Sequence, residues 1–200
     1  MISIYNIKPA FQKILKPILH KLFALGVTAN QITISSILLS LVIGVCFWFS
    51  EYQTLLFLTL PIGLLLRMAL NALDGMMART YNQQSKLGEV LNEVGDTVSD
   101  FFIFFPLLKY FNEQLFLVIV FICLSIINEF SGLMAKIISG ERRYDGPMGK
   151  SDRAFVISIL GILLFFKIPL GGFILYVFIF INLLLTLSTY KRLSGALKDA

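Results

Sequence analysis

Charged and metal-binding side chains are scarce in this sequence. Charged residues make up only 14% of its 200 residues, with one histidine and two cysteines. A soluble domain carries about 25% charged residues, so the composition excludes an ordinary soluble protein. Zinc and redox sites need histidines or cysteines at short spacings, and this chain has no such spacing. We interpret Cys46 and Cys123, which lie in apolar segments, as packing residues.

Apolar residues make up most of the chain instead. They account for 57% of it, and the mean hydropathy is +0.82. A helix that crosses the hydrocarbon layer of about 30 Å needs about 20 predominantly apolar residues. Six segments approach or exceed that length: 32–50, 54–73, 94–108, 115–138, 154–168 and 169–190. We predict an all-α integral membrane protein with six transmembrane helices, in which 1–200 form a single domain and 32–190 form the bundle.

The N-terminal segment 1–30 has a different pattern. Apolar residues recur at helical spacing between Ile7 and Phe23, and four lysines are interleaved with them. This pattern is typical of an amphipathic helix that lies in the membrane interface. A cleavable signal peptide is not expected, because the segment lacks a continuous apolar core.

The positions of the basic residues predict the orientation. If the N-terminus is cytoplasmic, every Lys and Arg lies on the cytoplasmic side except Lys109, Lys167 and Arg67. Both termini and the loops 79–88 and 139–152 are then cytoplasmic. We expect the bacterial inner membrane, with a eukaryotic internal membrane as the alternative. This bias and attraction to anionic lipid head groups account for the net charge of +5 without a nucleic-acid partner.

One polar stretch, NALDGMMARTYNQQSKLGEVLNEVGD, interrupts the apolar background. Asn71, Asp74 and Ala78 lie three and four residues apart, so a helix places them on one face. A second set recurs every four residues: Gly88, Asn92, Asp96 and Asp100. Two antiparallel helices joined by a tight polar loop would bring both faces together. The pattern predicts an oxygen-lined pocket at the cytoplasmic surface.

The chemistry of this pocket follows from its donors. Carboxylate and amide oxygens without His or Cys suit Mg²⁺, Mn²⁺ or Ca²⁺, and such ions usually serve phosphate chemistry. Arg79 near the same rim would pair with a phosphate, and glycines would let it come close. The residues therefore predict metal-dependent handling of a phosphorylated, lipid-linked substrate.

The polar stretch resembles the motif of the CDP-alcohol phosphatidyltransferase family, which reads DxxDGxxAR, then eight or nine residues, then GxxxDxxxD. Six residues match it in order and spacing: Asp74, Gly75, Ala78, Arg79, Gly88 and Asp96. The preceding segment VTANQIT is similar to the family's sequence at the start of its first span. The resemblance implies six transmembrane helices, a homodimer, and transfer of a phosphatidyl group from CDP-diacylglycerol to an alcohol with release of CMP, in phospholipid biosynthesis.

The resemblance also implies roles for individual residues. Asp96 is expected to be the general base on the acceptor hydroxyl. The nucleotide is expected to lie against a second set: Gly75, Ala78, Arg79 and Gly88. The family holds two divalent ions with four carboxylates, but Asn71 and Asn92 stand at the first and third of those positions. Here Asp74 and Asp96 keep their charge, while the asparagines offer only neutral amide oxygens.

These two asparagines change what the site is expected to bind. With half the formal negative charge, we expect weaker binding of Mg²⁺ or Mn²⁺, or one ion instead of two. An alternative hypothesis is a degenerate family member that binds nucleotide or lipid without turnover. A third is a small transporter that uses Arg67, Asp100 and Glu129 as intramembrane charges. It is disfavoured because the acidic residues gather at one rim instead of the midplane.

Further charged residues lie outside the motif. Arg67 and Asp100 are expected to neutralise each other within the membrane. The segment GERRYDGPMGKSDRAF gathers four basic residues that would form a pocket for an anionic acceptor head group: Arg142, Arg143, Lys150 and Arg153. The alternative is a positive-inside loop that ends in a helix cap at Ser151.

Overall fold

The computed structural model describes residues 8–200, which form helices joined by short connections, with no strand in that range. The helices are α1 (Lys8–Ala24), α2 (Ala29–Trp48), α3 (Thr59–Thr80), α4 (Lys86–Phe104), α5 (Leu107–Tyr110), α6 (Leu115–Ser139), α7 (Lys150–Phe165) and α8 (Phe173–Lys198). Short 3₁₀ turns at Thr54–Leu58 and Asn112–Gln114 precede α3 and α6. The all-α prediction is confirmed for these residues.

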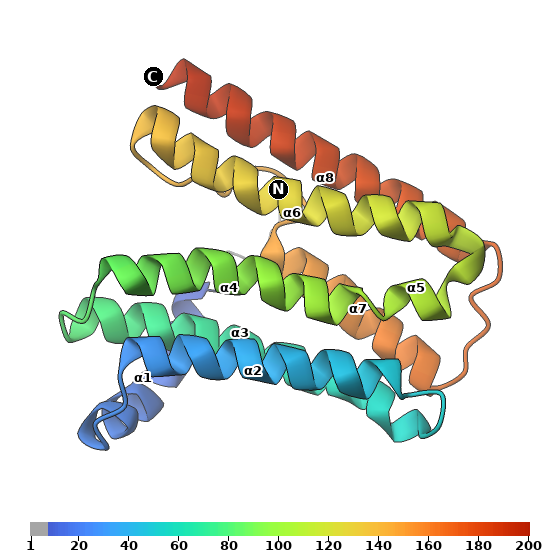
Figure 1. The fold of residues 1–200 in the computed structure, drawn as a ribbon, viewed down its shortest axis with the longest axis horizontal. Coiled ribbons are helices and arrows are strands. Elements are labelled where there is room, and N and C mark those ends of the chain that lie inside the picture. The colour runs from blue at the N-terminus through green and yellow to red at the C-terminus, as the bar shows by residue number, and fades with distance from the viewer. Residues whose placement is uncertain (1–7) are drawn as a thin grey trace.

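The long helices form two groups that run side by side (Figure 1). Helix α2 packs on α3 and α4, and α6 packs on α8. Helix α7 packs on α3 and lies between the two groups. Because α3 and α4 are neighbours on α2, the two polar faces of the motif lie at the same end of the bundle.

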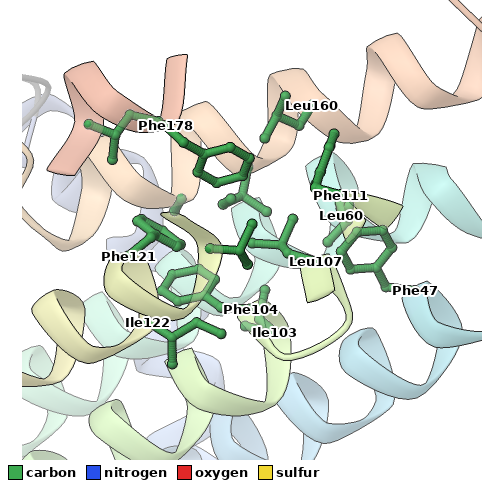
Figure 2. Packing of buried hydrophobic residues seen from close by; sticks show 14 of the residues in the cluster. Phe47, Leu60, Ile103, Phe104, Leu107, Phe111, Phe121, Ile122, Leu160 and Phe178 are labelled. Carbon is green, nitrogen blue, oxygen red and sulfur yellow. The ribbon is translucent and has the colours of Figure 1, made fainter. Parts of the chain in front are cut away.

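A core of aliphatic and phenylalanine side chains joins the two groups. Figure 2 shows Phe47 of α2, Phe104 of α4, Leu107 of α5, Phe121 of α6 and Phe178 of α8 as members of one cluster of buried side chains. All five side chains are buried. The Phe121 and Phe178 ring centroids lie 6.1 Å apart at 61°, a favourable edge-to-face arrangement.

Side-chain caps fix where the helices near the motif begin. Thr28 and Gln31 form a capping box at the start of α2, and Ser85 accepts from the Gly88 N–H at 3.0 Å at the start of α4. Ser151, the cap of the alternative interpretation of this loop, does not cap α7. Helix α7 begins at Lys150 with Gly149 as its cap, because the Asp152 carboxylate accepts from the Gly149 N–H at 3.0 Å.

Four helical segments are long and apolar enough to cross a membrane: Ala29–Trp48, Thr54–Thr80, Asn112–Ser139 and Phe173–Lys198. They correspond to four of the six predicted spans. The predicted spans 94–108 and 154–168 correspond to α4 and α7, which do not meet the same criteria. Helix α7 has only 16 residues, and α4 begins with a charged turn and carries four carboxylates: Glu89, Glu93, Asp96 and Asp100.

Helix α1 packs against the end of α3. Leu15 and Leu19 are buried against apolar residues of α2 and α3, while Ile14 and Ile18 are exposed on another face. The helix continues through Pro17. The predicted amphipathic pattern included Ile7, which lies outside the described residues.

One other expectation concerns the surface of the bundle. Cys46 is half-buried, but Cys123 is exposed, so the prediction that both cysteines pack inside is wrong for Cys123.

At the end of the bundle away from the motif, Lys109 Nζ donates to Glu51 at 2.5 Å and to the Trp48 carbonyl at 3.0 Å. The bond to Glu51 raises the pKa of Lys109 above its ordinary value. These contacts hold the turn after α2 against α5.

The buried core predicts a large effect of one truncation. Phe178→Ala should lower the free energy of unfolding by about 3 kcal/mol, because the ring is fully buried between Phe111 and Phe121 and leaves a cavity. Thermal unfolding in detergent micelles measures the effect. Phe180→Ala on the same helix, where the ring is 60% exposed, should leave stability nearly unchanged. Equal losses in the two variants would contradict this description of the core.

Candidate active site

A cavity of about 1050 Å³ lies at the end of the bundle where α3 and α4 are joined. Helices α1, α2, α3, α4 and α6, the loop 140–149, the start of α7 and the end of α8 contribute to its lining. All eight motif residues line it: Asn71, Asp74, Gly75, Ala78, Arg79, Gly88, Asn92 and Asp96. The structure therefore brings together the residues that the motif singled out.

Hydroxyl groups of α2 orient the polar residues of α3. The Thr33 hydroxyl donates to Asp74 Oδ2 at 2.9 Å, and the Ser36 hydroxyl donates to Asn71 Oδ1 at 2.6 Å. Thr33 and Ser36 are themselves buried. Sequence reasoning gave neither residue a site role, although hydroxyls three residues apart in an apolar helix are a usable sign of polar contacts between membrane helices.

Asp96 on α4 is surrounded by donors. The Asn71 amide nitrogen donates to Asp96 Oδ1 at 3.3 Å, and Lys150 Nζ forms an ion pair with the same oxygen. The Arg67 guanidinium lies 3.8 Å from Oδ1 and also donates to the Asp96 carbonyl oxygen at 3.3 Å. The carboxylate thus joins α3, α4 and the first residue of α7 at the cavity.

The two motif glycines permit close approaches. A Cβ on Gly88 would lie 2.7 Å from Asn30 Oδ1, so a side chain there would collide with the start of α2. A Cβ on Gly75 would lie 3.3 Å from the Arg79 guanidinium. Arg79 is exposed and forms no ion pair within residues 8–200. Its guanidinium is therefore free to bind an anion above the bare strip at Gly75.

A buried ionic network lies behind the cavity. Asp100 accepts from Arg67 at 2.8 Å, which confirms the predicted pair, and from Arg153 at 2.7 Å through its other oxygen. Arg153 also donates to Glu129 at 2.7 Å, and Glu129 accepts from Arg142 at 2.8 Å. The network connects α3, α4, α6 and α7. The intramembrane charges of the transporter hypothesis are therefore matched to one another.

The four basic residues of the predicted acceptor pocket do not all reach the cavity. Arg142 and Lys150 line it. Arg153 is fully buried, because Asp100 and Glu129 hold its guanidinium inside the bundle. Arg143 turns away from the cavity because it pairs with Asp145 at 2.6 Å and with Asp199 at the end of α8.

Helix α8 contributes a cation that sequence reasoning missed. Arg192 lines the cavity and is almost fully buried. It donates to the carbonyl oxygens of Asn128 at 2.5 Å and Asp145 at 3.3 Å, and it forms no carboxylate ion pair within the described part of the chain. From the sequence, Arg192 is only one of the basic residues that predict which side of the membrane is cytoplasmic.

The loop 140–149 is fixed against α8 by its backbone. Gly146 has a φ of +96°, and a Cβ there would lie 2.6 Å from Ser188 Cα. The Ser188 hydroxyl also donates to the Asp145 carbonyl oxygen at 3.0 Å. Only glycine allows the loop to approach α8 this closely, and the approach places Arg142 at the cavity.

The donors in the cavity do not fit a pair of divalent ions. Within residues 8–200, no three or more His, Cys, Asp or Glu side chains are grouped so that they could hold a metal ion. The motif supplies only two carboxylates, and Asp96 is already matched by Lys150. Asn71 turns its amide nitrogen, not its oxygen, towards Asp96. Asp74 and Asn92 remain as oxygen donors that line the cavity.

These features define a class of protein. Four helices of membrane length surround a polar cavity that contains carboxylate, amide and guanidinium groups at one end of the bundle. Such a site suits an enzyme that acts on the phosphorylated head group of a lipid while the acyl chains remain in the bilayer.

A comparison with protein families identifies the class further. A family model described as CDP-alcohol phosphatidyltransferase matches residues 26–188. The chain therefore belongs to this family, as the motif predicted. It is an enzyme of phospholipid biosynthesis that transfers a phosphatidyl group from a CDP-linked lipid to an alcohol and releases CMP.

Two individual proteins are similar to the chain in sequence. The chain is 47% identical over 160 residues to the inner membrane protein YnbA of Escherichia coli, a match that covers 80% of this chain and 79% of that protein. It is 35% identical over 100 residues to an archaetidylinositol phosphate synthase of Pyrococcus horikoshii, half of each chain.

Solved structures share the fold. The phosphatidylinositol phosphate synthase PgsA1 of Mycobacterium tuberculosis, in complex with manganese and citrate, superposes with a TM-score of 0.74 over 90% of this chain and 88% of that chain. A second structure of PgsA1, with CDP-DAG bound, gives 0.75 over 92% and 94%. Sequence identity is 20% in both cases, so these likenesses show the fold alone.

The buried network predicts the effect of removing its central charge. Asp100→Asn should lower the free energy of unfolding by about 3 kcal/mol or more, because Arg67 and Arg153 would keep their charges without a shared partner. Thermal unfolding in detergent measures the loss. Asp145→Asn, which removes a pair whose carboxylate is 46% exposed, should leave stability nearly unchanged. A native-like midpoint for Asp100→Asn would show that the network does not stabilise the bundle.

Proposed function

We propose that this chain catalyses the transfer in the cavity between α3 and α4, with CDP-diacylglycerol as donor and an alcohol as acceptor. The convergence of all eight motif residues on one cavity carries the proposal. The acceptor oxygen attacks the β-phosphorus of the donor, and the bond from that phosphorus to the CMP oxygen breaks. The acceptor proton passes to Asp96, whose carboxylate lines the cavity.

The nucleotide is proposed to lie along the start of the motif. Gly75 and Gly88 leave bare backbone at the cavity, and Ala78 adds only a methyl group between them. The exposed Arg79 guanidinium would bind a phosphate of the donor with charge-assisted hydrogen bonds. PgsA1, which shares this fold, has been solved with CDP-DAG bound, and this supports a CDP-linked lipid as substrate.

A divalent cation, Mg²⁺ or Mn²⁺, is proposed to bind at Asp74 and Asp96, with the amide oxygens of Asn71 and Asn92 as weaker neutral ligands. Such an ion would neutralise the diphosphate and the charge that develops on the transferred group. The manganese complex of PgsA1 supports a divalent cation in this fold. Thr33 holds the Asp74 carboxylate in the orientation that faces the cavity.

The acceptor is proposed to enter beside the loop 140–149. Arg142 and Lys150 line the cavity there, and Arg192 adds a third cation from α8. Arg143 and Arg153 support this region indirectly, since Arg143 pairs with Asp145 in the loop and Arg153 anchors the start of α7.

We further propose a single domain with six transmembrane helices. Helices α4 and α7 would cross the membrane in addition to the four long helices. Both termini and the cavity would face the cytoplasm of the inner membrane, as the basic residues predict, and YnbA of Escherichia coli is named an inner membrane protein. The exposed Ile14 and Ile18 would place α1 in the interface. The family resemblance supports a homodimer.

The proposal predicts acceptor-dependent CMP release. Purified protein with CDP-diacylglycerol, Mg²⁺ or Mn²⁺ and a panel of alcohols should release CMP with at least one acceptor. Asp74→Asn and Asp96→Asn should each reduce the rate by about 100-fold or more, because they remove the metal carboxylate and the base. Glu51→Gln, at the end of the bundle away from the cavity, serves as the control. Absence of release with every acceptor, from folded protein that binds the CDP-lipid, would favour the degenerate binder.

Restoring the family's aspartates distinguishes the two hypotheses directly. In an enzyme adapted to asparagine, Asn71→Asp with Asn92→Asp should reduce CMP release about tenfold or more. The reason is that a carboxylate oxygen would replace the Asn71 amide nitrogen, which lies 3.3 Å from Asp96 Oδ1, and would repel that oxygen instead of donating to it. A degenerate member should instead gain activity that the native protein lacks. Side-by-side rates of the two proteins at saturating Mg²⁺ decide between these outcomes.

A further inference from the structure

Asp96 is occupied by the chain's own positive charge. Lys150 Nζ pairs with Asp96 Oδ1, and Arg67 lies 3.8 Å from the same atom. The third neighbour of this oxygen is the Asn71 amide nitrogen at 3.3 Å. Oδ1 of Asp96 therefore faces three donors that belong to the chain itself.

Asn71 is fixed in an orientation that donates to Asp96. Its Oδ1 accepts from the buried Ser36 hydroxyl at 2.6 Å, which directs the amide nitrogen towards Asp96. An aspartate at position 71 would place a second carboxylate oxygen where the amide nitrogen now lies, 3.3 Å from Asp96 Oδ1. Two carboxylates this close would need a cation between them. The asparagine removes that requirement.

Lys150 is held in place by the helix to which it belongs. It is the first residue of α7, and Arg153, three residues later, is fully buried on Asp100. Asp96 and Asp100 are one turn apart on α4, so Lys150 to Asp96 and Arg153 to Asp100 form two successive ion pairs between α7 and α4. The Lys150 side chain is only 26% exposed. Its ammonium group is therefore positioned, unlike that of a solvated surface lysine.

The charges agree with this arrangement. Asp74 and Asp96 supply two negative charges, so one divalent ion together with Lys150 would leave an excess of one positive charge, whereas two such ions together with Lys150 would leave an excess of three. We propose that the Lys150 ammonium group takes the place of a second divalent ion at Asp96, so that the cavity binds one divalent cation. This inference rests on the proposed function, because it concerns how the same cavity neutralises the donor diphosphate.

Lys150 would also act during the reaction. When Asp96 takes up the acceptor proton it loses its negative charge, and the ammonium group beside it is left without its partner. That charge is then available to the oxygens of the transferred phosphoryl group, where negative charge develops. Lys150 is therefore proposed as a charge-compensating residue of the transfer.

Metal binding without any lipid substrate tests the inference. Electron paramagnetic resonance of free Mn²⁺ gives the number of ions bound per chain and their affinity. The native protein should bind one Mn²⁺. Lys150→Met should bind Mn²⁺ about tenfold more tightly, because a repelling charge is removed beside the ligands. Lys136→Met is the matched control, since Lys136 also pairs with a carboxylate of α4, Glu89. It should behave like the native protein.

A second variant tests the number of bound ions instead of their affinity. The combination Asn71→Asp, Asn92→Asp and Lys150→Met restores four carboxylates and removes the ammonium group, and it should bind two Mn²⁺ ions. In turnover assays, Lys150→Met should lose activity by on the order of 100-fold, with partial recovery in Lys150→Arg. Two ions on the native protein, or equal Mn²⁺ affinity in Lys150→Met and Lys136→Met, would overturn the inference.

The two proposals fail in different ways. If the native protein binds one Mn²⁺ and the Lys150 variants bind Mn²⁺ as expected, but no alcohol supports CMP release, the proposed function fails and the charge substitution stands. If CMP is released by a protein that binds two ions, the proposed function stands and the role of Lys150 is wrong.

Discussion

The two oxygens of Asp100 hold the polar interior of this protein together, because one accepts from Arg67 on α3 and the other from Arg153 on α7. A buried carboxylate between two guanidinium groups leaves one positive charge over, and Glu129 on α6 matches it. Each of these groups would be costly alone in a membrane. Their mutual neutralisation allows four helices to meet around a polar cavity.

The same principle extends to the edge of the cavity. Arg142 is matched by Glu93 and Glu129, and Lys150 by Asp96. In the part of the chain that the structure describes, Asp74, Arg79 and Arg192 line the cavity without an ion pair. The substrate's phosphates would therefore meet a site whose surroundings are largely balanced in charge, so that the few unmatched groups determine how the substrate binds.

The sequence predicted the motif faces and the Arg67 to Asp100 pair because both depend only on helical periodicity and on the cost of a lone charge in lipid. It did not predict the roles of Ser36 and Thr33, since a hydroxyl in an apolar helix acquires a partner only when the neighbouring helix is placed. The same holds for Arg153. Its position in a basic loop resembled that of Arg142, yet the packing of α7 turned its side chain inward to Asp100 and Glu129.

Helix ends were less predictable than helix faces. Ser151 is an ordinary capping residue, but the Asp152 carboxylate accepts from the Gly149 N–H, and α7 therefore begins at Lys150. This shift decides the direction of the Lys150 side chain, and with it the partner of Asp96. The number of membrane spans was also hard to predict from the sequence. Helices α4 and α7 have short apolar segments and carry charges that are neutralised only when the helices pack together.

The contact between Gly146 and Ser188 has a consequence for how the family diversifies. Because the loop backbone touches α8 without room for a side chain, its path is set by α8 and cannot be lengthened or redrawn at that point without moving the helix. With the acceptor bound beside this loop, as proposed, a change of acceptor preference would come from exchange of the side chains that the loop carries, at positions such as 142 and 144, on an unchanged backbone path.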